Sequence, residues 1–126
     1  MLPFIDELKA LNLPDGSYAI FGSGPLAVRG IREAKDLDVL VRKDVWDELA
    51  KKYTRNVKGT GLQIGNIEAF CQWSPWFDDP DALIDTAEVI DGLPFVRLEH
   101  VVSWKSAMGR EKDIKDLELI ENYLSK

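Results

Sequence analysis

Cysteine and histidine are scarce in this chain, which has one of each among 126 residues. The single Cys71 has no second cysteine with which to form an internal disulfide, and Cys71 and His100 together are too few ligands for a zinc site. Any metal would have to be held by oxygen ligands, which favours magnesium or manganese.

Long apolar runs are also missing. The hydrophobic runs are far too short to cross a bilayer, and residues 1–10 lack the basic start and cleavage site of a signal peptide. We therefore expect a cytoplasmic protein that has no membrane contact.

Basic residues are absent from residues 59–96, which hold seven acidic residues, and the whole chain has a net charge of −6. General nucleic-acid binding needs a basic face, so this balance argues against that class of function. It still permits a nucleotide site in which metal ions supply the positive charge.

The remaining composition is that of an ordinary globular protein, with 45% hydrophobic and 30% charged residues. A chain of this length has room for one core, so we predict a single domain over residues 1–126. Periodicity and turn residues predict an α/β (α+β) fold with a small mixed β-sheet flanked by helices. The expected helical segments are 3–11, 25–31, 45–53, 82–86, 98–108 and 112–123, and the expected strands are 17–21, 37–41, 62–64, 67–71, 88–90 and 95–97.

A glycine-rich turn, Gly22-Ser23-Gly24, joins the first expected strand to a helix that begins near Pro25. Such a turn points backbone N–H groups and the positive end of a helix at whatever lies in front of it, which suits a phosphate. Alone, it is more often an ordinary strand–helix turn. The spacing of the glycines also satisfies the dinucleotide-binding fingerprint, but Gly30 interrupts the helix earlier than that fold allows. A P-loop is excluded, because no Gly-Lys-Ser/Thr follows the turn.

Asp36 and Asp38 stand two residues apart on the next expected strand, so their side chains project from the same face. Carboxylates placed side by side repel each other unless a cation lies between them. Two divalent ions could bridge the pair and serve a phosphoryl transfer. The alternative is a solvated edge of the sheet, which we favour less because the glycine turn lies so close in the sequence.

Gly22-Ser23 before a short helix, followed by Asp36-Leu37-Asp38 on the next strand, resembles the signature of the polymerase-beta-like nucleotidyltransferase superfamily. Residues 24–33 and the tail 109–117 are also similar to small bacterial members, so the resemblance covers about residues 17–71 and 98–124. It implies a nucleotidyltransferase-like fold, in which the two aspartates bind Mg²⁺ or Mn²⁺ behind the phosphate loop. The family usually has a third carboxylate that helps to activate the attacking hydroxyl. Glu68 matches its position, although aspartate is more common there.

Some of these residues also fit purely structural roles. Glu68 is either the third catalytic and metal-binding carboxylate or an ordinary polar residue on the outer face of a hairpin strand. Lys105, Arg110 and Lys112 cluster around an expected helix break, where they could reach a triphosphate. A solvated helix face is the favoured reading for each of these three residues taken singly.

The other charged and aromatic residues carry weaker signals. We expect Arg29 and Arg32 to form surface ion pairs with Glu33 and neighbouring acids. Trp46 and Trp104 lie in helical patterns and are expected in the core. In the loop that follows Glu68, packing into the core is favoured over base stacking for the three aromatic residues, which are Trp73, Trp76 and Phe77.

Together these features predict a metal-dependent nucleotidyltransferase that moves a nucleoside monophosphate from a nucleoside triphosphate to an unknown hydroxyl acceptor. The triphosphate would lie against Gly22 and Ser23, with Lys105 and Lys112 as candidate phosphate ligands. The alternative is a catalytically inactive protein of the same fold that binds or regulates a partner, such as an antitoxin-like partner of a helical protein. A protein partner or a homo-oligomer is compatible with either function.

Overall fold

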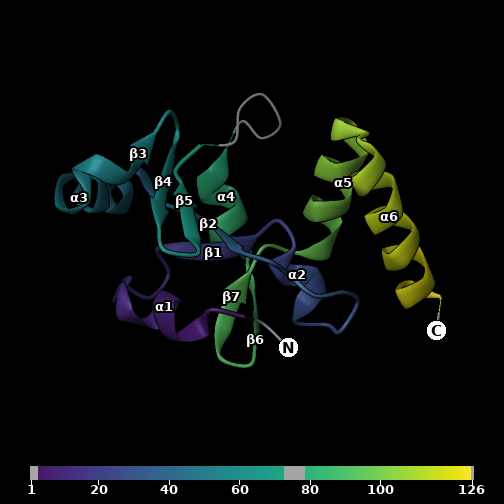
Figure 1. Ribbon diagram of the computed structural model, residues 1–126. Coiled ribbons are helices and arrows are strands. Elements are labelled where there is room, and N and C mark those ends of the chain that lie inside the picture. Colours follow the sequence, from purple (N-terminus) through teal and green to yellow (C-terminus); the bar gives the residue numbers. More distant parts are fainter. Residues whose placement is uncertain (1–2, 73–78, 126) are drawn as a thin grey trace.

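The computed structural model describes residues 3–72 and 79–125, and it has the mixed α/β fold that the sequence predicts. Its strands form one seven-stranded sheet in the order β3-β4-β5-β2-β1-β7-β6 (Figure 1). The strands are β1 (Tyr18–Phe21), β2 (Leu37–Val41), β3 (Val57–Lys58), β4 (Gly61–Ile64), β5 (Ile67–Phe70), β6 (Glu88–Ile90) and β7 (Leu93–Phe95). The helices are α1 (Ile5–Ala10), α2 (Gly24–Ala27), α3 (Lys43–Lys52), the 3₁₀ turn η1 (Thr54–Asn56), α4 (Pro80–Asp85), α5 (Leu98–Met108) and α6 (Glu111–Leu124).

The centre of the sheet combines parallel and antiparallel pairs. β1 lies antiparallel to β2 and parallel to β7, while β2 lies parallel to β5. In this register Asp38 pairs with Phe21 on one side and with Glu68 on the other. Paired residues of neighbouring strands project from the same face, so the register places Glu68 beside Asp38.

Helices cover both faces of the sheet, and each face has its own apolar cluster. Leu37, Val39 and Val41 alternate along β2 toward the face covered by α1 and α3, as predicted. Leu40 faces the other side, where the cluster includes Phe21 and residues of α4, α5 and α6. The antiparallel pair α5–α6 stands at one side of the molecule in Figure 1. Asp38 shares the face of Leu40 and therefore lies on the side of α5 and α6.

Two predicted helix boundaries near β2 are wrong. The helix expected over residues 25–31 is a single turn, α2, and the chain leaves it through Gly30, whose φ is 73°. The helix expected over residues 45–53 is α3, which begins earlier, at Lys43, with Arg42 as its N-terminal cap residue. Asp44 lies in its first turn, where a negative charge is favourable.

Further differences concern short strands. None of the expected strands covers residues 57–61, yet Val57 and Lys58 pair with β4 and extend the sheet. The strand expected over residues 95–97 lies two residues earlier, as β7 over Leu93–Phe95. The buried side chains of Leu93 and Phe95 share one face, and Arg97 is already the N-terminal cap residue of α5. The expected helix α5 is confirmed over residues 98–108.

The remaining predictions have mixed outcomes. Trp104 is buried as expected, whereas Trp46 is half-buried and packs against the core from α3. Arg29 forms its ion pair with Glu88 of β6 rather than with Glu33. The aromatic loop that contains Trp73, Trp76 and Phe77 lies outside the described residues. Among the helices that the structure describes, none is long and apolar enough to span a membrane.

Candidate functional site

The turn between β1 and α2 lies directly against a carboxylate of β2. Gly22 has a φ of 66°, and a Cβ atom placed on it would lie 2.6 Å from Oδ2 of Asp38. The positive φ favours glycine here, and a side chain would have to displace the Asp38 carboxylate. The predicted phosphate loop and the predicted metal ligand, which the sequence signature had linked, therefore lie next to each other.

Ser23 is the N-terminal cap residue of α2, but its hydroxyl makes no capping hydrogen bond. Its carbonyl oxygen accepts the N–H groups of Leu26 and Ala27 at 3.1 and 3.0 Å. The helix that it caps is one turn long, so its dipole is a weaker source of positive potential than the sequence suggested. The hydroxyl is left to donate to a group in the cleft that Ser23 lines.

The cleft has a volume of about 620 Å³ and is lined by four carboxylates, of which three lie on or beside the strands β2 and β5 and the fourth is Asp116 of α6. Asp36 is exposed immediately before β2, Asp38 is half-buried on β2, and Glu68 is half-buried on the neighbouring β5. None of the three forms a hydrogen bond or ion pair with another residue of the described chain. Unpaired carboxylates gathered on one wall make a strongly negative surface, to which a cation would be attracted.

The carboxyl group of Asp38 has a pKa far above the ordinary value of an aspartate. The pKa of its carboxyl is raised to about 7, chiefly by burial and also by the nearby charges of Asp36 and Glu68, while Lys105 and Lys112 act in the opposite direction. Without a cation, part of the Asp38 population is protonated near neutral pH. A divalent ion would favour the charged form, because it replaces the like-charge repulsion by attraction.

The carboxylates fit a hard divalent cation by the chemistry of their donor atoms. Carboxylate oxygens are the ligands that Mg²⁺ and Mn²⁺ prefer. Within residues 3–72 and 79–125, however, no three histidine, cysteine or acidic side chains converge closely enough to hold an ion. Glu68 leans toward β4, where its Oε2 atom lies 2.6 Å from the place that a Cβ of Gly61 would occupy. Asp36 and Asp38 are therefore the residues that would hold the metal.

Basic side chains line the cleft from α5, from α6 and from the segment that precedes β2. Six basic side chains line the cleft together with four acidic ones, although the chain as a whole is acidic. These basic residues are Arg32, Lys35, Lys105, Arg110, Lys112 and Lys115. The sequence had suggested Lys105, Arg110 and Lys112 as residues that could reach a triphosphate, and it had assigned Arg32 to a surface ion pair. Lys35 and Lys115 were not predicted at all, because isolated lysines in exposed segments carry no sequence signal.

Lys105 corrects a prediction, because it is not on a solvated helix face. Its side chain is 3% exposed, and Nζ donates to Oδ2 of Asp116 at 2.8 Å and lies 3.8 Å from Oδ1 of Asp113. It lines the cleft from a fixed position held by α6, since a buried ammonium group must be paired. Lys112 is exposed, as the solvated-face interpretation expected, and it has no ion-pair partner in the described part of the chain.

Arg32 also belongs to this network. Its Nε and Nη2 atoms donate to the two carboxylate oxygens of Asp116 at 2.6 and 2.9 Å, so its expected ion pair with Glu33 is replaced by a bidentate pair with α6. Burial alone would raise the pKa of Asp116, but the hydrogen bonds from Arg32 and Lys105 hold it below its usual value. Asp116 thereby ties the segment before β2 to the α5–α6 pair.

Arg110 caps α6 and is held by the same helix. Its Nε atom donates to Oδ2 of Asp113 at 2.6 Å, and Asp113 accepts the backbone N–H of Arg110 at 3.2 Å. Burial would raise the pKa of Asp113, yet these hydrogen bonds keep it low. Arg110 is therefore less available to a phosphate than Lys112.

Comparison with known proteins bears on the fold alone. No family model and no curated protein matches the chain. A crystal structure of a putative nucleotidyltransferase from Thermotoga maritima matches with a TM-score of 0.62 and 16% sequence identity, over 99% of this chain and 96% of the other. The chain therefore has the fold of a nucleotidyltransferase, with the carboxylates of β2 and β5 facing the basic wall of α5 and α6.

Proposed function

We propose that this protein is a metal-dependent nucleotidyltransferase that moves a nucleoside monophosphate from a nucleoside triphosphate to a hydroxyl acceptor. The observation that carries the proposal is the cleft, in which three unpaired carboxylates face a wall of basic side chains. A magnesium–triphosphate complex carries both charges that this arrangement would bind: a cation for the carboxylates and phosphate oxygens for the basic side chains. The likeness of fold to a nucleotidyltransferase supports the same class of reaction.

Different residues of the cleft bind the metal ion and the phosphate groups. Asp36 and Asp38 hold the divalent ion, which supplies Lewis-acid polarisation of the triphosphate when it is bound. Ser23 donates its hydroxyl to a phosphate oxygen, and Gly22 keeps the backbone close enough for the phosphate to approach. Lys112 neutralises charge on the outgoing phosphates, because it is exposed and unpaired while Lys105 is held by Asp116.

In the transfer step the acceptor oxygen forms a bond to the α-phosphorus as the bond from that phosphorus to the bridging oxygen breaks. Pyrophosphate leaves with the bonding electrons, and the proton of the acceptor hydroxyl passes to a base. Glu68 is the proposed base, because it is the third unpaired carboxylate on the same face as Asp38. To act, its side chain would have to turn from Gly61 toward the aspartates.

Calorimetric titration with ATP, CTP, GTP and UTP, each with and without magnesium, tests this function. We expect binding that requires magnesium and that is lost in Asp38→Asn. Asp91→Asn is the matched control, because it removes one acid from the β6–β7 turn, which does not line the cleft. Unchanged nucleotide affinity in Asp38→Asn would contradict the metal assignment.

One observation favours the second candidate, a protein that binds nucleotide without transferring it. The Glu68 carboxylate leans toward Gly61, and the three acids do not converge on one point. A protein of this kind would keep the magnesium-dependent affinity of the cleft yet release no pyrophosphate. Pyrophosphate release in the presence of candidate acceptors distinguishes the two functions.

A further inference from the structure

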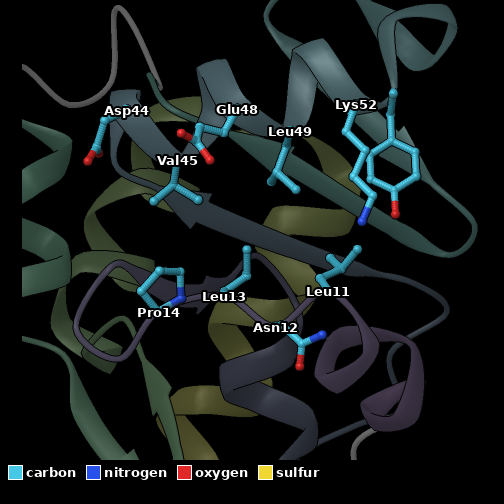
Figure 2. Close-up of a pocket in the computed structure, with 10 residues that line it drawn as sticks. Leu11, Asn12, Leu13, Pro14, Asp44, Val45, Glu48, Leu49 and Lys52 are labelled. Atoms are coloured by element: carbon cyan, nitrogen blue, oxygen red, sulfur yellow. The ribbon is translucent and has the colours of Figure 1, made fainter.

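A second hollow lies on the opposite face of the sheet from the carboxylate cleft. It is a groove of about 430 Å³ between the segment 11–14, which leads from α1 to β1, and one face of α3 (Figure 2). This volume falls in the range of small-molecule sites. The residues that α3 contributes are Asp44, Val45, Glu48, Leu49, Lys52 and Tyr53, and the facing segment contributes Leu11, Asn12, Leu13 and Pro14.

The floor of the groove is apolar and incompletely covered. Leu11, Leu13, Val45 and Tyr53 pack against the core below them, yet each remains half-buried. In Figure 2, Leu11 and Leu13 point toward α3, whereas Asn12 points away from the groove. A ligand with an apolar body would complete the burial of these side chains and gain the free energy of their desolvation.

The rim of the groove carries the charge that such a ligand must match. Asp44 and Glu48 are exposed and stand one helical turn apart, a like-charge spacing that is unfavourable on a helix. In the part of the chain that the structure describes, neither carboxylate has an ion-pair partner. Lys52 lies one turn beyond Glu48, but its Nζ atom is placed over the ring of Tyr53, 5.5 Å from the centroid. In Figure 2 Lys52 lies at the opposite end of the groove from Asp44, so the acidic end of the groove is open to a cation from outside.

We propose that this groove binds a small amphiphilic organic cation, a ligand with an aliphatic body and one primary ammonium group. The body lies on the apolar floor between segment 11–14 and α3, and the ammonium group lies between Asp44 and Glu48. The proposal goes beyond nucleotide transfer and is independent of it, because no residue of the groove lines the carboxylate cleft.

The experiment is a titration of the full chain, labelled with ¹⁵N, with hexylammonium in the absence of nucleotide and metal. We expect a dissociation constant on the order of millimolar, which is what a ligand of this size can support. The amide shifts should move within residues 11–13 and 44–53 and not around Gly22, Asp38 or Glu68. Hexanoate and hexanol, which have the same body with a negative or no charge, should bind at least several-fold more weakly.

Variants of α3 test whether the negative charge of Glu48 contributes to binding of the cation. Glu48→Gln should weaken hexylammonium up to about fivefold, the range of an exposed ion pair. Glu48→Lys should reverse the preference, so that hexanoate binds more tightly than hexylammonium. The matched control is Asp47→Asn, because Asp47 stands on the same helix but pairs with Lys43 and does not line the groove.

Three results would overturn the proposal: no shifts in the groove, equal binding of all three probes, or equal weakening by Glu48→Gln and Asp47→Asn. The titration uses no phosphate and no metal, so its failure leaves the nucleotide experiment untouched. Conversely, loss of magnesium–nucleotide binding in Asp38→Asn leaves the hexylammonium shifts unchanged.

Discussion

Replacing Gly22 by alanine should separate the function of the β1–α2 turn from its conformation. Alanine in the left-handed region costs roughly 1–2 kcal/mol of stability. At Gly22 the new Cβ would also meet the carboxylate of Asp38 at 2.6 Å, which is too close for real atoms. A carboxylate at the end of a side chain can rotate away, so we expect little further loss of stability but a displaced metal ligand.

Gly30→Ala is the matched control for this change. Gly30 has a φ of 73°, close to the 66° of Gly22, but a Cβ there would meet nothing within 4 Å. Both variants should therefore lose a similar free energy of unfolding in urea, roughly 1–2 kcal/mol. Only Gly22→Ala should lose magnesium-dependent nucleotide affinity, by about tenfold or more, since a displaced charged ligand costs about 1.5–3 kcal/mol.

The double variant that combines Gly22→Ala with Asp38→Asn tests whether the two positions act on nucleotide binding through each other. In Asp38→Asn the metal ligand is already lost, so adding Gly22→Ala should not lower the residual, magnesium-independent nucleotide affinity any further. Calorimetry on the four proteins, together with Gly30→Ala, gives the coupling between the two positions. If Gly22→Ala binds magnesium–nucleotide as well as Gly30→Ala does, the contact between the turn and Asp38 has no part in binding.

The remaining predictions concern the carboxylates and the lysines. Glu68→Gln should keep nucleotide binding and abolish pyrophosphate release; a variant that still turns over would remove Glu68 as the base. Because the folded pKa of Asp38 is raised to about 7 from an ordinary value of 3.8, the folded state holds its proton more tightly. This group should therefore lower the metal-free unfolding free energy as pH rises from about 4 to 7, by up to about 4 kcal/mol, and Asp38→Asn should remove that slope in urea titrations. Lys105→Met should cost about 3 kcal/mol of stability, because it leaves buried carboxylates short of a partner. Lys112→Met should change stability by less than about 0.5 kcal/mol yet weaken nucleotide binding, and equal stability losses in the two lysine variants would contradict the burial of Lys105.

Local pattern was enough to predict the carboxylate wall of the cleft. The alternation in β2 placed Leu37, Val39 and Val41 in the core, which leaves Asp38 on the other face. The glycine and serine of the turn were visible for the same reason, since they lie within one strand–helix unit. What the sequence could not supply was the contact between Gly22 and Asp38, because it depends on the antiparallel pairing of β1 with β2.

The basic wall was harder to predict, because it comes from a distant part of the chain. Lys105 looks like any exposed helical lysine until Asp113 and Asp116 of α6 are seen to enclose it. The bidentate pair of Arg32 with Asp116 spans 84 residues, and nothing local marks either partner. Strand boundaries failed where tertiary pairing decides them, as in β3, whose two residues are strand only because β4 lies beside them.

The order of the two walls along the chain has a consequence for synthesis on the ribosome. The acidic wall is complete once β5 has emerged, whereas Lys105, Lys112 and Asp116 follow only with α5 and α6. Asp36, Asp38 and Glu68 therefore leave the ribosome before the lysines of α5 and α6, although Arg32 and Lys35 precede them. A half-made chain could then attract metal ions but would lack the wall that holds phosphate, so nucleotide could be retained only after α6 has docked.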